Sequence, residues 1–178
     1  MDKVLVYLSI IHEGDWNKIY NHISEKLPVD KEEMERVINS NTCDYITILD
    51  SKYPIQLKHI FKPPFVLFYK GNVDLLTNEE LKKIAVIGSR LNTDYGKHVT
   101  EEICQNIVCN SSSVIVSGLA KGIDSIAHKT CLNCGGKTIA VLGNGLNVVY
   151  PKENNKLYEL ISKTLSEQVF VDNWLWFW

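Results

Sequence analysis

Three short apolar runs dominate the pattern between Lys83 and Pro151. Each run is rich in β-branched residues and ends in a glycine: KIAVIG at 83–88, SVIVSG at 113–118 and KTIAVLG at 137–143. Uninterrupted runs of this kind are typical of strands that are buried on both faces of a parallel sheet. The segments between the runs are long enough for crossover helices, so the pattern predicts a βαβαβ unit of the α/β class.

Apolar residues recur at helical spacing in the segments that follow the three runs. The second of these helices is expected to open at Gly122, and the third at Pro151, because proline is favoured in the first turn of a helix. The residues expected to face inward are Val99, Ile103 and Ile107; Ile126, Ala127 and Cys131; and Leu157, Leu160, Ile161 and Leu165.

The first 42 residues have the pattern of a small helical module. Residues 3–13 place Val4, Leu5, Leu8 and Ile11 on one helical face. Asp15 and Asp30 stand where the N-caps of two further helices are expected, and Asp30 forms a capping-box pattern with the Glu three positions later. Both an independent module and a helical cap on the sheet fit this pattern.

A connecting segment, 43–82, follows the module. It contains two short strand candidates, 45–49 and 65–71, and two consecutive prolines introduce the second of them. We therefore expect a core at 83–168 that is preceded by helices and edge strands.

Charge is distributed unevenly along the chain, whose net charge is −2. Residues 1–50 hold five Lys and Arg against ten Asp and Glu, whereas residues 88–152 hold six against four. This is not the bulk positive field of a generic nucleic-acid binder. Any anion site is therefore expected to be local, built from a few cations and backbone amides.

The cysteines and the apolar runs predict a cytoplasmic protein. No apolar run approaches the roughly 20 residues of a membrane span, and the N-terminus lacks the small-residue cleavage site of a signal peptide. Five Cys is an odd count for a disulfide framework. Cys131 and Cys134 form a C-x-x-C pair, which is open to a zinc or redox interpretation. A zinc site needs four ligands and no second such pair exists, so we expect no metal.

Ligand sites of parallel α/β sheets form from the loops at the carboxyl ends of the strands. Here these loops are 88–90, 117–124 and 143–152, and each of them carries a cation that could neutralise a phosphate. Their glycines would let the backbone approach a ligand, and the helix N-termini that follow would favour anions. The predicted binding residues are Gly88, Ser89, Arg90, Ser117, Gly118, Lys121, Gly122, Gly143 and Lys152.

Asp124 and His128 lie four residues apart on the second expected helix. Such a pair can act as a general base, but no nucleophile with a recognisable context accompanies it. We therefore expect a structural hydrogen bond between the two side chains and no catalysis.

Three motifs carry a resemblance to a known family. GSR at 88–90, SGLAKGID at 117–124 with AHK at 127–129, and GNGLNVVYP at 143–151 together resemble the DprA/Smf family, over about residues 53–165. The resemblance implies a Rossmann-like fold, single-stranded DNA binding and loading of the RecA recombinase during natural transformation. It also implies a homodimer with no cofactor, and a SAM-like N-terminal domain.

The chain departs from the family pattern after residue 168. The expected next strand, its arginine- and asparagine-bearing continuation and the final glycine-rich strands are missing, so we expect an incomplete sheet and an atypical tail at 169–178. Three of the four Trp lie in this tail. A truncated or frame-shifted terminus, or one that needs a partner, would explain it.

Two enzyme classes compete with DNA binding. The glycines at 143–145 resemble the start of G-x-G-x-x-G, but Val148 occupies the third glycine position and the motif follows the third strand, so NAD binding is disfavoured. A phosphoribohydrolase-like nucleotide enzyme is the better rival, although it would need a positioned carboxylate in a later glycine-rich loop. The sequence therefore predicts a sequence-independent binder of single-stranded DNA that is not an enzyme.

Overall fold

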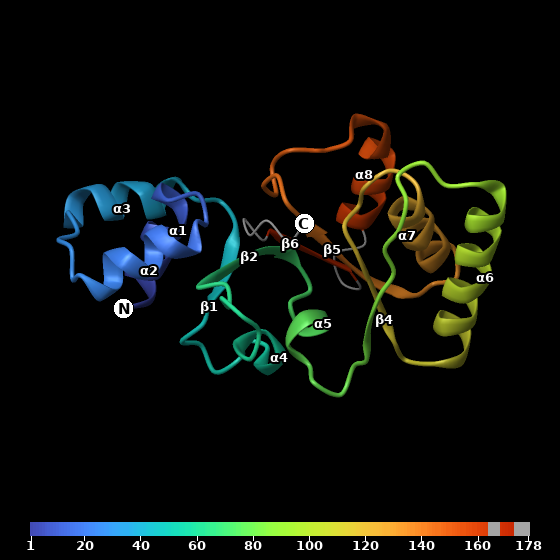
Figure 1. Ribbon diagram of the computed structural model, residues 1–178, viewed down its shortest axis with the longest axis horizontal. Helices are drawn as coiled ribbons and strands as arrows, with labels where there is room; N and C mark the ends of the chain where they lie inside the picture. The colour runs from blue at the N-terminus through green and yellow to red at the C-terminus, as the bar shows by residue number, and fades with distance from the viewer. Residues whose placement is uncertain (164–167, 173–178) are drawn as a thin grey trace.

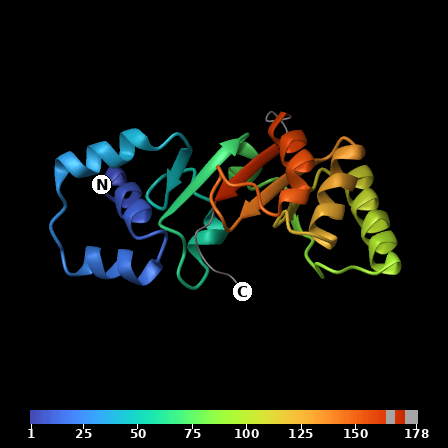
Figure 2. The ribbon, with the colours of Figure 1, turned by 90° about the horizontal axis from the view of Figure 1, so that it is seen from above.

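A computed structural model describes residues 1–163 and 168–172. The molecule is elongated, with a helical module at one end, a sheet in the middle and a second group of helices at the other end (Figure 1). The view from above shows the same succession along the long axis (Figure 2).

A six-stranded mixed sheet forms the centre, in the order β1-β2-β6-β5-β4-β3. The strands β3, β4, β5 and β6 run parallel, whereas β2 is antiparallel to both β6 and β1. The predicted α/β class with a parallel core is confirmed. The strands are Asp44–Thr47 (β1), Val66–Gly71 (β2), Lys83–Ala85 (β3), Val114–Ser117 (β4), Lys137–Leu142 (β5) and Gln168–Asp172 (β6).

The strand β6 corrects one expectation. The sequence pattern predicts a tail outside the sheet at residues 169–172 and no strand after residue 168. Instead β6 pairs with β5 on one side and with β2 on the other, for example Val169 with Ile139 and with Gly71. The prediction failed because this pairing joins segments that are distant in sequence. Residues 173–178, the rest of the expected tail, lie outside the described residues.

Helices cover the two faces of the sheet unequally. One face packs against α6 (Asp94–Asn110), α7 (Ile123–Asn133) and α8 (Asn155–Lys163), which follows a short 3-10 turn, η1 (Lys152–Asn154). The other face packs against two single-turn helices, α4 (Ile55–Lys58) and α5 (Asp74–Thr77). Burial of apolar side chains against both faces supplies the main stabilisation of such a layered fold.

The buried face of α6 differs from the expected one. Ile103 is 48% exposed, whereas Thr100 and Cys104 are buried and Ile107 is half-buried. Thr100 can be buried because its hydroxyl donates to the carbonyl of Gly96, so its polar atom is satisfied. The buried face of α6 thus includes a polar residue, Thr100, and the spacing of apolar residues alone does not predict this.

Two further expectations of burial are wrong. Leu160 on α8 is exposed, while Leu157 and Ile161 are buried as expected. The first apolar run was expected to be buried on both faces, but β3 is the last strand in the sheet order, and Ala85 and Ile87 are exposed. An edge strand has a neighbour on one side only, so its side chains receive less cover.

The N-terminal module contains α1 (Asp2–Ile11), α2 (Trp16–Ser24) and α3 (Lys31–Ser40). Both predicted N-caps are confirmed, because Asp15 and Asp30 each accept hydrogen bonds from two backbone N–H groups of the first turn. Glu33 accepts a hydrogen bond from the hydroxyl of Tyr7, 3.0 Å away, and so links α3 to α1.

The module is joined to the sheet through α1. Leu5 and Val6 belong to the same apolar cluster as Val66 and Phe68 of β2. The hydroxyl of Thr47 in β1 also donates to the carboxylate of Asp2, over 3.0 Å. Among the described residues, no helix is both long enough and apolar enough to cross a bilayer.

Candidate nucleic-acid interface

The loops after β3, β4 and β5 lie at one edge of the sheet because the three strands are parallel. Hydrogen bonds and close backbone contacts connect them. We call residues 88–90, 117–124 and 143–154 the strand-end loops. They contain all nine residues that the sequence predicted for binding.

The first two loops are interlocked. The backbone N–H of Ile123 donates to the carbonyl of Ser89, over 3.2 Å. Gly122 has a left-handed φ of 78°, and a Cβ there would overlap that same carbonyl oxygen. A Cβ on Gly88 would lie 2.8 Å from Cγ1 of Ile123. Both glycines are therefore required by the packing of one loop against the other.

Ser117 and Gly118 are committed to internal hydrogen bonds. Ser117 is buried, and its hydroxyl donates to the carbonyl of Val86 over 2.7 Å. The N–H of Gly118 donates to Oδ2 of Asp124, over 3.1 Å. These donors were expected to face a phosphate, but they hold the second loop in place. We therefore regard both residues as positioning residues.

The three predicted cations are exposed and come from the three loops. The backbone carbonyl of Arg90 would lie 2.8 Å from a Cβ on Gly122, so Arg90 adjoins the second loop. Lys121 in that loop forms an ion pair with Glu153, its Nζ lying 2.5 Å from Oε1. Glu153 follows Lys152 in η1. The hydrogen bond from Lys121 lowers the pKa of the Glu153 carboxyl.

The third loop is more open at its start. A Cβ on Gly143 would meet no other atom within 4 Å. The turn is closed by Asn144, whose side-chain amide donates to the carbonyl of Val148 over 2.6 Å. Gly145 has a φ of 81°, so it is the residue of this turn that needs the freedom of glycine.

Asn154 is a positioning residue that sequence reasoning missed. It is buried, and its amide donates to the carbonyls of Leu119 and Ala120, at 2.8 and 3.1 Å. Leu119 needs support because its φ of 56° is unusual for a residue with a side chain. The only local signal is an Asn three residues after Pro151, which reads equally well as an ordinary helix-start residue.

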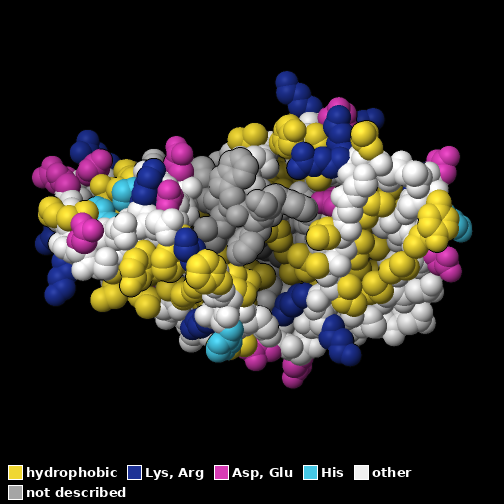
Figure 3. Space-filling view, viewed as in Figure 1, with side chains coloured by type: hydrophobic (Ala, Val, Ile, Leu, Met, Phe, Trp, Pro, Cys, Tyr) yellow, Lys and Arg dark blue, Asp and Glu magenta, His cyan; other side chains and the backbone are white. Residues whose placement is uncertain are grey.

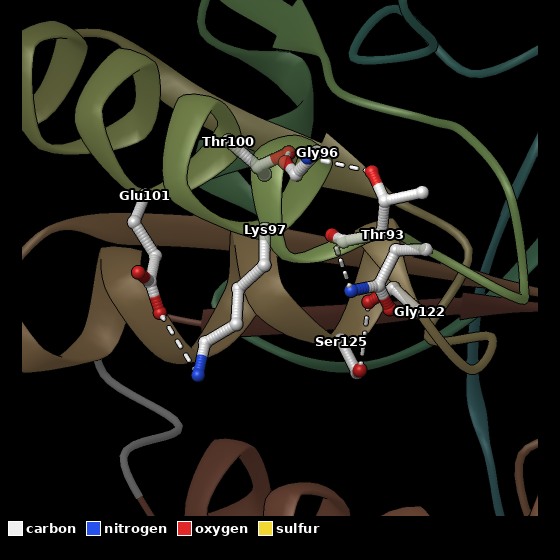
Figure 4. A network of polar contacts seen from close by, with 8 residues as sticks. Thr93, Gly96, Lys97, Thr100, Glu101, Gly122 and Ser125 are labelled. Atoms are coloured by element: carbon white, nitrogen blue, oxygen red, sulfur yellow. Dashed lines mark hydrogen bonds and ion pairs between the residues drawn. The ribbon is translucent and has the colours of Figure 1, made fainter.

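The N-termini of α6 and α7 lie side by side next to these loops (Figure 4). Thr93 caps α6 by accepting from the N–H of Gly96, over 3.1 Å, whereas α7 starts at Gly122 without a side-chain cap. The hydroxyl of Ser125 donates to the carbonyl of Gly122. The N–H of Ile123 is already used by the carbonyl of Ser89, so the partial positive charge of the helix start and its remaining backbone N–H groups are what α7 could offer an anion.

The predicted hydrogen bond between Asp124 and His128 is wrong. Asp124 accepts from Gly118, and Nδ1 of His128 lies 2.8 Å from the hydroxyl oxygen of Thr138 in β5. Complete burial lowers the pKa of His128 to about 4, so the ring is neutral at physiological pH. Both side chains therefore have structural partners beneath the loops.

The C-x-x-C cysteines face different environments. Cys131 is buried, and its thiol donates to the carbonyl of Lys137, whereas Cys134 is partly exposed at the end of α7. Burial raises the pKa of Cys131 to about 12. Within residues 1–163 and 168–172, no group of three or more His, Cys, Asp or Glu could hold a metal ion.

A cavity of about 500 Å³ lies on the face of the sheet that carries α4 and α5. It is mainly apolar, and none of the nine predicted binding residues lines it. An apolar cavity does not favour an anion, so the candidate anion site is placed at the cations and helix N-termini and not at this cavity.

Comparison with known proteins agrees with this architecture. Residues 44–171 match the family model for DNA recombination-mediator protein A. The chain is 50% identical over 115 residues to DNA processing protein DprA of Streptococcus pneumoniae, covering 65% of this chain and 39% of that protein. It is 43% identical over 119 residues to protein Smf of Synechocystis, covering 66% of this chain and 30% of the relative.

Two solved structures are also similar. The X-ray structure of DprA from Streptococcus pneumoniae matches with a TM-score of 0.71 and 35% identity, covering 96% of this chain and 60% of that one. DNA processing protein A from Helicobacter pylori, whose structure describes a single-stranded DNA binding mode, matches with a TM-score of 0.58 and 29% identity, covering 74% and 56% of the two chains.

The chain spans less than half the length of the curated relatives that it matches. Even so, the family model covers most of the sequence and includes β1 through most of β6 as well as all three strand-end loops. The chain therefore belongs to the DNA recombination-mediator protein A family.

Proposed function

We propose that this chain binds single-stranded DNA without sequence preference, at the strand-end loops, and does not catalyse a reaction. The observation that carries the proposal is the placement of Arg90, Lys121 and Lys152 in three loops at one edge of the sheet. Each cation can contact a phosphate, and the start of α7 adds backbone donors. The single-stranded DNA binding described for the Helicobacter pylori relative supports the same ligand.

The resemblance to DprA and Smf proteins extends this proposal to a role in DNA-mediated transformation, with the RecA recombinase as partner and a homodimer as the assembled form. The chain covers 39% and 30% of two of these relatives, so these roles of a whole protein are separate proposals for this chain. Sedimentation of the purified protein tests the dimer. The loading role is tested by following the assembly of RecA filaments on DNA that is already coated with a single-stranded DNA-binding protein, with and without this chain.

Arg90→Ala tests the DNA site. Losing one phosphate contact should weaken binding to oligo-dT and reduce the dependence of log K on log salt by about 0.7. Arg36→Ala is the matched control, because Arg36 is also exposed but lies on α3, in the N-terminal module. Unchanged affinity and slope for Arg90→Ala would remove this residue from the site.

Competition separates a DNA binder from a nucleotide enzyme. Labelled oligo-dT is titrated off the protein with unlabelled DNA, with mononucleotides and with NAD, at two salt concentrations. A strand engages several cations at once, so DNA should compete best and salt should weaken it steeply. Equal competition by mononucleotides or NAD with little salt dependence would contradict the proposal.

A further inference from the structure

Aromatic side chains from two distant segments stack on one another beside the N-terminal module. Trp16 and Tyr20 of α2 have ring centroids 4.8 Å apart and nearly parallel planes. Phe65, just before β2, stacks on Trp16 at 5.4 Å. Trp16 thus joins an exposed ring on α2 to the loop that precedes β2.

Lys62 places a cation within this group. Its Nζ lies 5.5 Å from the ring centroids of both Trp16 and Phe61, which is within cation–π range. The same amine donates to Oδ1 of Asn17 over 2.9 Å, and the indole N–H of Trp16 donates to the carbonyl of Pro63. The loop is therefore fixed against α2 and presents the ammonium group between two rings.

Two of the rings remain open to solvent. Phe61 is 84% exposed and Tyr20 is 50% exposed. Hydrophobic side chains gather between α2 and α4 on the face shown in Figure 3, with Lys and Arg side chains at the edge of the patch. Single exposed apolar residues are common, so exposure alone decides nothing. What distinguishes this surface is that one cation, Lys62, lies within cation–π range of two of the rings.

The charged groups around the rings favour a polyanion. Lys18 is exposed on α2, two residues after Trp16, and Lys62 lies between Trp16 and Phe61. Asp15 lies 3.9 Å from Lys18 and offsets its charge, so the preference for a polyanion rests on Lys62, which the rings hold. An apolar anchor of a protein partner would have to desolvate Lys62, whereas a nucleotide offers a base to the rings and a phosphate to the cation.

We propose that Trp16, Tyr20, Phe61 and Lys62 form a second contact for single-stranded DNA, an aromatic–lysine surface on which bases stack. This proposal rests on the proposed function, because it extends the path of the same strand. The surface lies at the end of the molecule that carries α2, away from α6, α7 and α8 (Figure 1). Only a strand long enough to reach both contacts would gain affinity from the linkage.

The test compares a short and a long oligo-dT with the double variant Tyr20→Ala and Phe61→Ala. Loss of base stacking should weaken binding of the long oligomer about tenfold or more, while the short one, held at the strand-end loops, changes little. Phe61→Tyr should bind like the wild type because it keeps a stacking ring. Leu49→Ala is the matched control, since Leu49 is also exposed but carries no ring.

A second readout locates the DNA directly. Photocrosslinking with a long oligomer that contains bromodeoxyuridine should label peptides with Tyr20 or Phe61. Crosslinks confined to 88–154, or unchanged affinity of the double variant for the long oligomer, would overturn the proposal. Unchanged DNA affinity together with altered sedimentation would assign the surface to a contact between protein copies and would also overturn it.

The same titrations distinguish this proposal from the proposed function. Arg90→Ala should weaken binding of both oligomers, whereas the aromatic double variant should affect only the long one. A wild-type protein that binds neither oligomer would remove the proposed function and this inference together. Circular dichroism confirms that the variants are folded, which is expected because both substituted side chains are solvent-exposed.

Discussion

The first two strand-end loops and the third one differ in what their glycines do. In 88–90 and 117–124, Gly88 and Gly122 let one loop pack directly against the side chains and backbone of the other. At the start of the third loop, Gly143 stands in open space. A glycine at the end of a strand can therefore be required for one of two reasons. It can allow another loop to pack closely against it, or it can leave open space beside the backbone. The sequence looks the same in both cases.

Among the substitutions that test this difference between the loops, Gly122→Ala should reduce stability the most. The added Cβ would overlap the carbonyl of Ser89, and φ at this position is left-handed, so the free energy of unfolding should fall by about 4 kcal/mol. Gly143→Ala should change it by less than about 0.5 kcal/mol. Urea denaturation measures both variants, and equal losses would contradict the distinction between the loops.

Acid should destabilise the region beneath the interlocked loops. The pKa of His128 is about 4 in the folded protein and about 6.5 when unfolded, so the unfolded state binds a proton first as pH falls. The stabilisation of the neutral ring is complete above pH 6.5 and is lost between pH 6.5 and 4, amounting to about 3 kcal/mol.

Thermal unfolding across that pH range measures the effect, and His128→Leu should flatten the pH dependence whatever its effect at neutral pH. The pKa of His12 is also lowered, chiefly by burial, and adds a contribution of the same sign. His59→Gln, at an exposed position, is the control. If the stability of His128→Leu fell as steeply with pH as that of the wild type, His128 would not be the cause of the pH dependence.

Asn154→Ala tests the link between the second and third loops. Two carbonyls lose their donor, which should lower the free energy of unfolding by about 2 kcal/mol and weaken DNA binding by releasing the loop that carries Lys121. Asn155→Ala is a neighbouring control, because Asn155 is exposed. Wild-type stability and affinity in Asn154→Ala would show that the loop keeps its shape unaided.

Glu153→Gln should have the smallest effect and the opposite sign. Glu153 pairs with Lys121 and would compete with a phosphate for it, so removing the negative charge should raise DNA affinity a few-fold at low salt. Glu101→Gln is the matched control on α6, where Glu101 pairs with Lys97. Weaker DNA binding by Glu153→Gln would mean that the ion pair orients Lys121 for the ligand.

The features that the sequence predicted well depend on short-range interactions. The helix caps at Asp15 and Asp30 involve N–H groups two and three residues away, so their local pattern is sufficient. The placement of Arg90, Lys121 and Lys152 at one edge of the sheet follows from the parallel strands that the apolar runs predicted. The positions of these helix caps and of the three cations could thus be predicted from the sequence.

The failures involve partners that are remote or polar. Asp124 bonds to the Gly118 backbone instead of to His128, and a satisfied Thr100 replaces Ile103 on the inner face of α6. Asn154 supports the loop at 119–120 only because folding carries it beneath that loop. A polar side chain is buried when a partner reaches it, and that partner is not evident from periodicity.

The amino-acid sequence by itself determined the α/β class, the alternation of strands and helices from β3 to α8, the caps of α2 and α3, and the loops that carry the cations. The tertiary structure decided that β6 lies between β2 and β5, that Gly88 and Gly122 are packing positions, and that Lys121 meets Glu153. The physical reason is distance along the chain. Caps and hydrophobic periodicity act over a few residues, whereas strand order and loop contacts depend on which distant surfaces exclude water together.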